Sequence, residues 1–357
     1  MPKESTCLKV PRIQGETALN AARKLGLADK ILLIQKIEAD SLCIPLSRQP
    51  DEAELTVLKS QMREFEICTH IFQEKRPQEK TLAEVLAAEL PTHLLAHLPR
   101  ALDVVGDIAI IEIPPNLESN KAAIGQAVLK THRNVKVVLA KAGVISGTYR
   151  LRDFEFIAGE HRTSTIHKEH GCAYYVDVAK AYFSPRLSNE HDRVARLVRE
   201  GEVVVDLFAG VGPFAVPIAK NRKTAKVYAI DINPDAIDLL KKNARLNRVE
   251  NKVFPIVGDA RQVVNEKLAG VADRVIMNLP ETANEFIDVT CKAVKPSRGV
   301  VHFYGFIKHP ETLEDMKNQF SEAVEKAGRK VAAFQYAKTV RETAPYEYQA
   351  VLDAEIL

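Results

Sequence analysis

The clearest hydrophobic pattern in the chain is a short β-branched run, Val203 to Val205, which is apolar at every position. A strand without polar alternation is typical of the centre of a parallel sheet, where both faces are buried. The run ends at Asp206, and Gly210 and Gly212 then allow the backbone to turn tightly and approach a ligand closely. The order of strand, glycine loop and helix predicts the first unit of a doubly wound nucleotide-binding sheet.

Apolar strands and amphipathic helices continue to alternate from residue 195 to the C-terminus. We expect strands at 226–231, 253–257, 273–278 and 299–306, and helices at 235–247, 283–294 and 310–327. Segments 330–339 and 346–357 form a hairpin-like closing pair. This alternation predicts an α/β domain at 195–357.

The chain before residue 195 has the pattern of two smaller α+β domains, at 1–72 and 81–194. In the first we expect a strand at 8–10, helices at 15–25 and 56–63, and a hairpin formed by 30–37 and 41–46. In the second we expect helices at 81–90 and 121–129, a turn that enters a strand within 103–113, and a strand at 135–140. Residues 73–80 are charged, with Pro77 as the one apolar residue, so we assign them as a linker.

Composition places the chain among ordinary soluble proteins and changes this picture little. Of the 357 residues, 46% are hydrophobic and 27% charged, and no apolar run is long enough to span a membrane. The five cysteines are widely spaced without a C-x-x-C pair, which argues for a reducing, cytoplasmic setting and against a structural zinc site. We expect no metal. Because the net charge is only +3, any nucleic-acid surface must be a local patch.

The glycine loop alone leaves two nucleotide-binding classes open. Gly210, Gly212 and Ala215 match G-x-G-x-x-[G/A], and Asp231 ends the next strand, where a carboxylate accepts hydrogen bonds from ribose hydroxyls in either class. Three later features favour one class: Gly258-Asp259, Asn278-Leu-Pro280 and the closing pair. With them, the region resembles a class I (Rossmann-like) S-adenosylmethionine-dependent methyltransferase, whose mostly parallel sheet has an antiparallel last strand. A nicotinamide-dependent dehydrogenase is the weaker alternative.

A more specific resemblance comes from motifs spread along the chain. These are the Asp103–Asp107 turn, Arg150-Leu-Arg-Asp-Phe-Glu155, Gly159–Glu169, Tyr182–Leu187 with Glu190, and Asn278-Leu-Pro280. Together they resemble the archaeal and eukaryotic tRNA (guanine-37-N1)-methyltransferases over essentially the whole chain. The resemblance implies a monomer that moves a methyl group from S-adenosylmethionine to N1 of the guanine 3′ of the anticodon. It also implies that the N-terminal domain contacts the outer corner of the tRNA.

This reaction requires a base and a cation. Guanine N1 carries a hydrogen and becomes a good nucleophile only as that proton leaves, so a general base must lie within hydrogen-bond reach. Negative charge then develops on O6, where a cation or fixed donor lowers the barrier. By resemblance, Glu190 is the base and Arg150 the O6 partner. Asn278 positions the guanine edge, and Tyr182 and Arg186 shape the pocket.

The resemblance also implies the binding residues. We expect Asp231 to hold the ribose, Ile232 to pack on the adenine, and the loop from Asp206 to Gly212 to border the methionine end. The full set of expected cofactor contacts is Asp206, Phe208, Gly210, Gly212, Asp231, Ile232, Asp259, Ala260, Asn278 and His191. In the basic segment 147–196, the expected RNA contacts are Arg150, Arg152, His167, Lys168, Arg186 and Arg193.

Two further alternatives remain open from the sequence. A relative that acts later in wyosine formation transfers an aminocarboxypropyl group, or methylates the tricyclic base. Glu190 and Asn278 favour N1 of guanine as the acceptor instead. The chain could also be a tRNA-binding module with a degenerate cofactor site, but four intact residues argue against that: Asp206, Gly210, Gly212 and Asp231.

Overall fold

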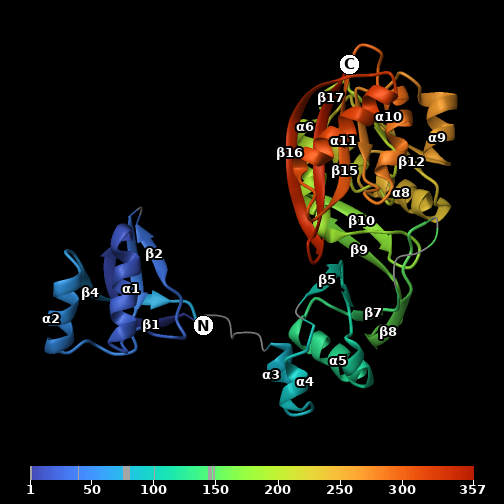
Figure 1. The fold of residues 1–357 in the computed structure, drawn as a ribbon. Helices are drawn as coiled ribbons and strands as arrows, with labels where there is room; N and C mark the ends of the chain where they lie inside the picture. Colours follow the sequence, from blue (N-terminus) through green and yellow to red (C-terminus); the bar gives the residue numbers. More distant parts are fainter. Residues whose placement is uncertain (1, 39, 75–80, 100, 144–146, 148) are drawn as a thin grey trace. The chain divides into compact units, whose positions relative to one another are not determined.

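We describe a computed structural model that covers residues 2–38, 40–74, 81–99, 101–143, 147 and 149–357. Contacts within the chain divide it into two compact units, residues 1–80 and 81–357 (Figure 1). Most of the expected linker, residues 75–80, lies outside the described residues. The separation of 81–194 from 195–357 stays a prediction. In the described residues, no helix is long and apolar enough to cross a membrane.

The first unit is a four-stranded antiparallel sheet with two helices on one face. The sheet order is β2-β3-β1-β4. Its elements are β1 (Lys3–Pro11), the short 3₁₀ helix η1 (Arg12–Gln14), α1 (Gly15–Lys24), β2 (Gln35–Glu38), β3 (Ser41–Pro45), α2 (Glu52–Gln61) and β4 (Glu66–Phe72). Leu8, Val10 and Ile44 pack on the helices, while Cys7, Cys43 and Phe72 form a separate cluster with Leu32.

The strand expected at 30–37 is wrong over its first half. The side chain of Asp29 accepts hydrogen bonds from the backbone N–H groups of Ile31 (2.7 Å) and Leu32 (3.0 Å), and this turn removes them from the ladder. Pairing with β3 therefore begins only at Gln35. Strand β4, at the edge of the sheet, was not expected from the sequence.

The second unit begins with a smaller α+β region. Its sheet has the order β5-β6-β7-β8, and β9 and β10 form a separate hairpin. The elements are α3 (Leu82–Leu86), α4 (Thr92–Leu95), β5 (Leu102–Val105), β6 (Ile108–Ile111), η2 (Pro115–Asn120), α5 (Lys121–Thr131), β7 (Val137–Lys141), β8 (Phe154–Gly159), β9 (Ser164–Glu169) and β10 (Cys172–Asp177).

A seven-stranded sheet with the order β13-β12-β11-β14-β15-β17-β16 follows. Strands β11 to β15 are parallel, β17 pairs antiparallel with β15, and β16 with β17, which confirms the predicted fold class. The elements are η3 (Pro185–Leu187), α6 (Ser188–Leu197), β11 (Val203–Asp206), α7 (Ala215–Asn221), β12 (Lys226–Asp231), α8 (Pro234–Leu246), β13 (Val253–Val257), α9 (Ala260–Val263), η4 (Val264–Leu268), β14 (Arg274–Met277), η5 (Ala283–Phe286), α10 (Ile287–Ala293), β15 (Gly299–Lys308), α11 (Leu313–Lys326), β16 (Val331–Ala344) and β17 (Glu347–Ile356).

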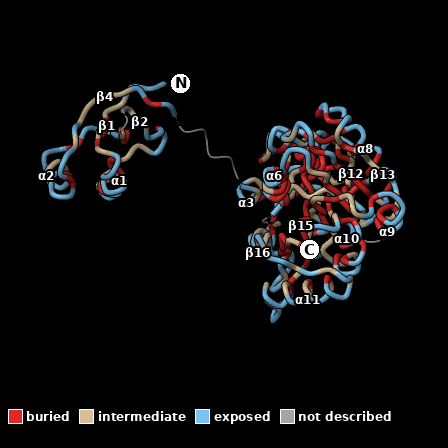
Figure 2. The backbone as a smooth tube through the Cα atoms, turned by 90° about the horizontal axis from the view of Figure 1, so that it is seen from above, coloured by how far each residue is buried: buried red, intermediate tan, exposed pale blue. Residues whose placement is uncertain are grey.

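Helices cover both faces of this sheet, and buried residues follow its strands (Figure 2). Val204 faces a cluster with α6, α7 and α8, whereas Val205 faces a cluster with α9, α10 and α11. This alternation explains why the 203–205 run is apolar at every position. The first cluster continues into β6, β7 and β10, so one core spans residues before and after 195.

Two buried amides join the β9–β10 hairpin to the seven-stranded sheet region. Asn243, on α8, accepts from the N–H of Tyr175 (2.6 Å) and donates to the carbonyls of Tyr175 (3.1 Å) and Val211 (2.9 Å). Asn247, one turn later, makes the same pair of bonds to Ala173. These bonds satisfy backbone N–H and C=O groups of β10. They therefore fix that strand beside the glycine loop.

Asp206, at the end of β11, is fully buried and has an unpaired carboxyl oxygen. Its Oδ1 accepts a long hydrogen bond from the N–H of Phe208 (3.4 Å), whereas Oδ2 has no partner. Burial, with the nearby Asp231 carboxyl adding to it, raises the pKa of Asp206 from 3.8 to about 7.

The Asp206 carboxyl should make stability fall as pH rises from about 4 to about 7. Over that range the folded protein holds a proton that the unfolded chain has already lost, so folding becomes less favourable with pH. The total effect should approach about 4 kcal/mol. Urea unfolding should therefore show an Asp206→Asn variant gaining stability over the wild type as pH rises from 5 to 7. A difference that stays constant across this range would contradict the assignment.

Candidate active site

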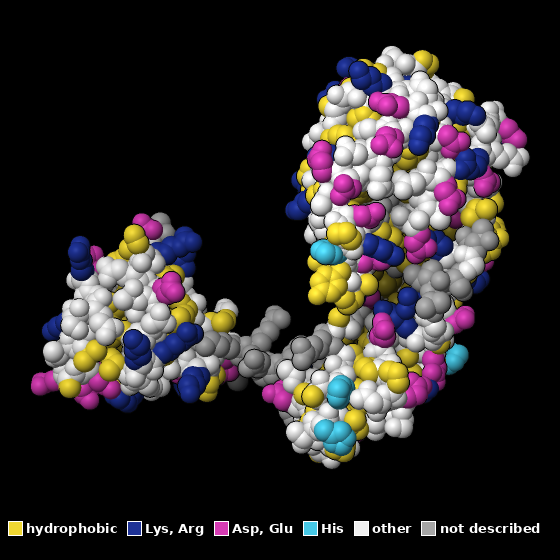
Figure 3. All heavy atoms as spheres, in the orientation of Figure 1, with side chains coloured by type: hydrophobic (Ala, Val, Ile, Leu, Met, Phe, Trp, Pro, Cys, Tyr) yellow, Lys and Arg dark blue, Asp and Glu magenta, His cyan; other side chains and the backbone are white. Residues whose placement is uncertain are grey.

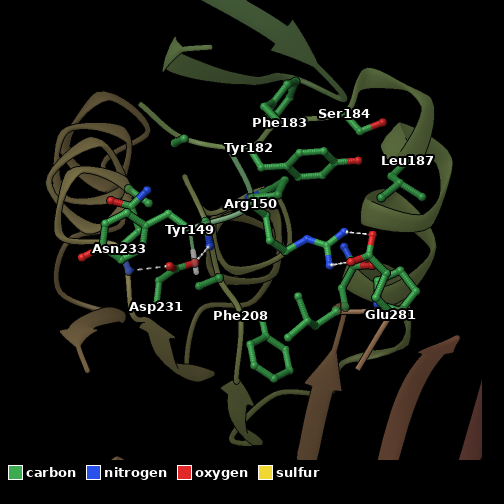
Figure 4. Close-up of a pocket in the computed structure, with 18 of the residues that line it drawn as sticks. Tyr149, Arg150, Tyr182, Phe183, Ser184, Leu187, Phe208, Asp231, Asn233 and Glu281 are labelled. Atoms are coloured by element: carbon green, nitrogen blue, oxygen red, sulfur yellow. Dashed lines mark hydrogen bonds and ion pairs between the residues drawn. The ribbon is translucent and has the colours of Figure 1, made fainter. Parts of the chain in front are cut away.

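A cavity of about 580 Å³ opens where the parallel strands of the seven-stranded sheet end (Figure 4). Its walls come from the residues that follow four strands: 207–210 after β11, 231–233 after β12, 258–260 after β13 and 278–282 after β14. The carboxyl ends of parallel strands are where open α/β sheets bind ligands. The other walls come from residues 149–154, 181–187 and the closing strands β16 and β17.

The glycine loop is held by the carboxylate of Asp231. Its Oδ2 accepts a hydrogen bond from the N–H of Gly210 (2.7 Å), and its Oδ1 accepts one from Asn233 (2.9 Å). Burial raises the pKa of Asp231. Gly212 has a φ of 91°, and a Cβ there would lie 2.2 Å from a methyl carbon of Leu240. Only glycine therefore lets helix α8 pack this closely against the loop.

The lining of this part of the cavity fits a nucleoside. Asp231 keeps a free lone pair on each oxygen for hydroxyl groups, and Ile232 is 40% exposed, so its side chain offers an apolar face to a flat ring. Phe208, edge-on to Phe286 at 4.9 Å, and Ala260 add apolar surface. The nearby unpaired oxygen of Asp206 also suits a ligand that carries positive charge.

Opposite this region, Arg150 is paired with Glu281 (Figure 4). Both terminal nitrogens of the guanidinium lie 2.6 Å from the carboxylate oxygens. Arg150 has a φ of 54°, which is uncommon for a residue other than glycine and brings its side chain into the cavity. Glu281 is half exposed, so this ion pair is open to solvent.

Three more expected residues lie at the cavity. Arg186 pairs with Asp103 through two hydrogen bonds, of 2.5 and 3.1 Å, and so joins η3 to β5. Tyr182 is 43% exposed, although large aromatic side chains are usually more buried. Arg152 adds a further basic side chain to the lining.

The carboxylate of Glu190 is turned into the protein and does not line the cavity. Its Oε2 accepts from the hydroxyl of Tyr304 (2.8 Å) and from Arg193 (2.8 Å). Arg193 also donates to Asp353 (2.5 Å), which accepts from Nδ1 of His302 (2.7 Å). Glu190 is 8% exposed and lies one turn after Leu187, which does line the cavity.

His191 lines the cavity, although it is almost fully buried. Its Nδ1 lies 2.7 Å from Glu169, and its ring is edge-on to Phe214 at 4.7 Å. His167 accepts a hydrogen bond from the N–H of Gly106 (3.1 Å) and faces the same carboxylate. Burial alone raises the pKa of Glu169, but its contacts with the two histidines outweigh burial and hold that pKa at about 2.

The structure thus brings together most of the residues expected from the sequence. Those that line the cavity are Arg150, Arg152, Tyr182, Arg186, His191, Phe208, Gly210, Asp231, Ile232, Asp259, Ala260 and Asn278. Those outside its lining are Glu190, Asp206, Gly212, His167, Lys168 and Arg193. On the face of the second unit seen in Figure 3, acidic and basic side chains are interspersed and border a hollow.

Some lining residues were missed by sequence reasoning. Arg341, on β16, donates to the side chains of Gln349 (2.8 Å) and Ser184 (3.1 Å). Gln349 reaches the side-chain oxygen of Asn278 at 3.4 Å. Glu281 directly follows an expected motif, yet its pairing with Arg150 spans 131 positions. Most of these contacts form between segments that are distant in the sequence, so no local sequence pattern predicts them.

Comparison with known proteins gives full-length relatives. The tRNA (guanine(37)-N(1))-methyltransferase Trm5b of Pyrococcus abyssi is 38% identical over 98% of both chains. Its crystal structure matches with a TM-score of 0.74 over 99% of both chains. The solved complex of aTrm5 and tRNALeu matches with a TM-score of 0.68 and 36% identity, over 98% of this chain and 99% of that one.

A shorter relative has another activity in its name. The tRNA(Phe) (4-demethylwyosine(37)-C(7)) aminocarboxypropyltransferase of Methanocaldococcus jannaschii is 36% identical over 70% of this chain and 96% of its own. Residues 165–332 match the TRM5/TYW2 methyltransferase domain, and residues 82–163 match the TYW2 N-terminal domain. On this evidence, the chain belongs to the TRM5/TYW2 methyltransferase family.

Proposed function

We propose that this chain is a tRNA (guanine(37)-N1)-methyltransferase that uses S-adenosylmethionine as the methyl donor. The main support is the 38% identity to a protein of that name along 98% of both chains. The aminocarboxypropyltransferase covers only 70% of this chain but 96% of its own, so it has no counterpart for a large part of these 357 residues. That difference favours methyl transfer to guanine. We also expect a cytoplasmic monomer.

The donor-binding end of the cavity is assigned to the strand-end residues. Asp231 accepts hydrogen bonds from the ribose, while Ile232, Asp259 and Ala260 surround the adenine. S-adenosylmethionine supplies an electrophilic methyl group on a positively charged sulfur. The Oδ2 of the buried Asp206 carboxyl has no other partner, so its ionised form favours this charge from behind the cavity wall.

The acceptor end is assigned to Arg150, Asn278, Tyr182 and Glu190. A base in an anticodon loop is unpaired, so bringing it into a pocket costs less than extrusion from a duplex. Arg150 exchanges Glu281 for the guanine O6, where negative charge develops. Glu190 turns from Tyr304 toward the cavity and accepts the N1 proton.

The product identifies the reaction. Full-length protein should be incubated with unmodified tRNA and S-adenosylmethionine, and the tRNA digested to nucleosides for mass spectrometry. We expect 1-methylguanosine at position 37. Addition of an aminocarboxypropyl group, or modification only of a tricyclic base, would instead assign the chain to a wyosine step.

Donor binding should depend on Asp231. Asp231→Ala removes the acceptor for the ribose hydroxyls, so S-adenosylmethionine affinity should fall by about 1.5 to 3 kcal/mol, measured by calorimetry. Asp235→Ala is a matched control, because Asp235 is exposed and does not line the cavity. Equal affinities in the two variants, both folded, would rule out the assignment.

Methyl transfer should depend on Glu190 and Arg150. Glu190→Gln keeps the shape but removes the base, so single-turnover methyl transfer should slow by about 10²- to 10⁴-fold while both substrates still bind. Arg150→Ala should also slow the step. Glu281→Gln serves as the control, because it breaks the same ion pair but leaves Arg150 free to reach the guanine. A Glu190→Gln rate within a few-fold of wild type at pH 6 to 8 would exclude this base.

The first unit should contribute to tRNA use and not to donor binding. The cavity residues all lie between 103 and 349, so deletion of residues 1–80 removes none of them. We expect unchanged S-adenosylmethionine affinity and a higher KM for full-length tRNA. Loss of donor binding in the truncated protein would show that the two units depend on each other.

A further inference from the structure

Three cysteines that are far apart in the sequence meet in the first unit. Cys7 lies on β1, Cys43 on β3 and Cys68 on β4, three strands that are adjacent in the sheet. Their sulfur atoms all lie within 4.8 Å of one another. They pack with Leu32 and Phe72 in a cluster separate from the one that contacts α1 and α2. The function proposed above does not use this cluster.

Two of these cysteines are positioned for a covalent bond. Cys7 and Cys68 are directly opposite each other in the antiparallel pairing of β1 and β4. Their sulfur atoms are 3.3 Å apart. Directly opposite residues of antiparallel strands have Cα separations of about 4.5 to 5.5 Å, within the range of disulfides. A small rotation of the two side chains would therefore bring the sulfurs to bonding distance.

Access differs among the three thiols. Cys7 and Cys43 are fully buried, whereas Cys68 is partly exposed. A reagent in solution can therefore meet Cys68 first, with Cys7 directly behind it. Cys43 is opposite Lys9 in the pairing of β1 and β3. Because Lys9 is two residues from Cys7 along β1, Cys43 lies diagonally across from Cys7.

The surroundings of the three cysteines favour a neutral disulfide over a bound metal ion. Three thiolates around a divalent cation carry a net negative charge, which is costly to bury among apolar side chains such as Leu32 and Phe72. Among the described residues, no fourth Asp, Glu, His or Cys ligand completes the group.

We propose that Cys7 and Cys68 are a site of reversible disulfide formation by exchange with a low-molecular-weight disulfide such as glutathione disulfide. The Cys68 sulfur attacks the reagent and releases one thiol. The Cys7 sulfur then attacks the mixed disulfide and releases the second thiol. Two cysteine thiols are oxidised, one disulfide reagent is reduced to two thiols, and the two cysteine protons leave on those thiols.

The bond would link residues 61 positions apart and tie the edge strand β4 to β1. A cross-link of that span stabilises chiefly by restricting the unfolded chain. The unfolding temperature of the first unit should therefore rise by about 5 °C or more on oxidation. Backbone amides of β1 and β4 should exchange hydrogen more slowly, while those of β11, in the second unit, should not change.

The test uses the full-length protein in glutathione buffers of increasing oxidised fraction. After denaturation and alkylation with iodoacetamide, the number of free thiols should fall from five to three. Peptide mapping should find one cross-link, between Cys7 and Cys68, and dithiothreitol should reverse it. Hydrogen exchange followed by mass spectrometry should show the slower exchange in β1 and β4.

Matched variants separate this site from general thiol oxidation. Cys68→Ser should abolish the cross-link, whereas Cys43→Ser, from the same cluster, and Cys291→Ser, from the other unit, should retain it. A cross-link from Cys7 to Cys43 would overturn the proposed pairing. So would retention of all five thiols in the most oxidising buffer, or stoichiometric Co²⁺ binding with thiolate absorption that protects all three cysteines.

Discussion

The guanidinium of Arg193 lies between two buried carboxylates, those of Glu190 and Asp353. The carboxylate side chains are only 11% and 3% exposed. Removing one partner of such a buried group typically costs about 3–5 kcal/mol, because the remaining charges lose their compensation. Helix α6, which carries Arg193 and Glu190, is thereby fixed to strand β17. The position of one wall of the cavity depends on this contact, because His191 lies in the first turn of the same helix and Leu187 directly precedes it.

The hydrogen bonds of Asp353 continue to His302 on the neighbouring strand β15 and define the tautomer of that histidine. His302 contacts Asp353 through Nδ1 and Arg274 through Nε2. Because a guanidinium only donates, Nε2 must accept, and Nδ1 carries the hydrogen given to Asp353. Burial alone raises the pKa of Asp353, but the hydrogen bonds from His302 and Arg193 outweigh burial and hold that pKa at about 2. These hydrogen bonds keep the buried Asp353 carboxylate ionised.

The ion pairs of Arg193 and the ion pair of Arg150 differ in a way that matters for function. The Arg193 pairs are buried, whereas the Arg150–Glu281 pair has a half-exposed carboxylate. Exposed ion pairs typically contribute at most about 1 kcal/mol, so Arg150 can exchange Glu281 for a substrate group at little cost. In the proposed mechanism, the buried ion pairs of Arg193 position helix α6, which carries the base. The exposed pair opens, and Arg150 then binds the guanine.

Local sequence patterns were enough to predict the class of fold and the motifs of the glycine loop. The apolar run at 203–205, the glycine loop and Asp231 each act through neighbours in the chain or through strand ends that a parallel sheet must bring together. For that reason most of the residues expected to contact the cofactor line one cavity. The turn set by Asp29 was not expected, because two hydrogen bonds to its side chain overrode an apolar pattern typical of a strand.

The contacts between distant segments could not be predicted from local sequence patterns. The pairing of Arg150 with Glu281, of Arg193 with Asp353, and of Cys7 with Cys68 joins positions 131, 160 and 61 residues apart. Sequence periodicity records which face of a helix or strand is buried, but not which distant side chain meets it there. Whether a charged residue faces the substrate or the core depends on that packing. This is why Glu190, expected at the cavity, points instead toward Tyr304 and Arg193.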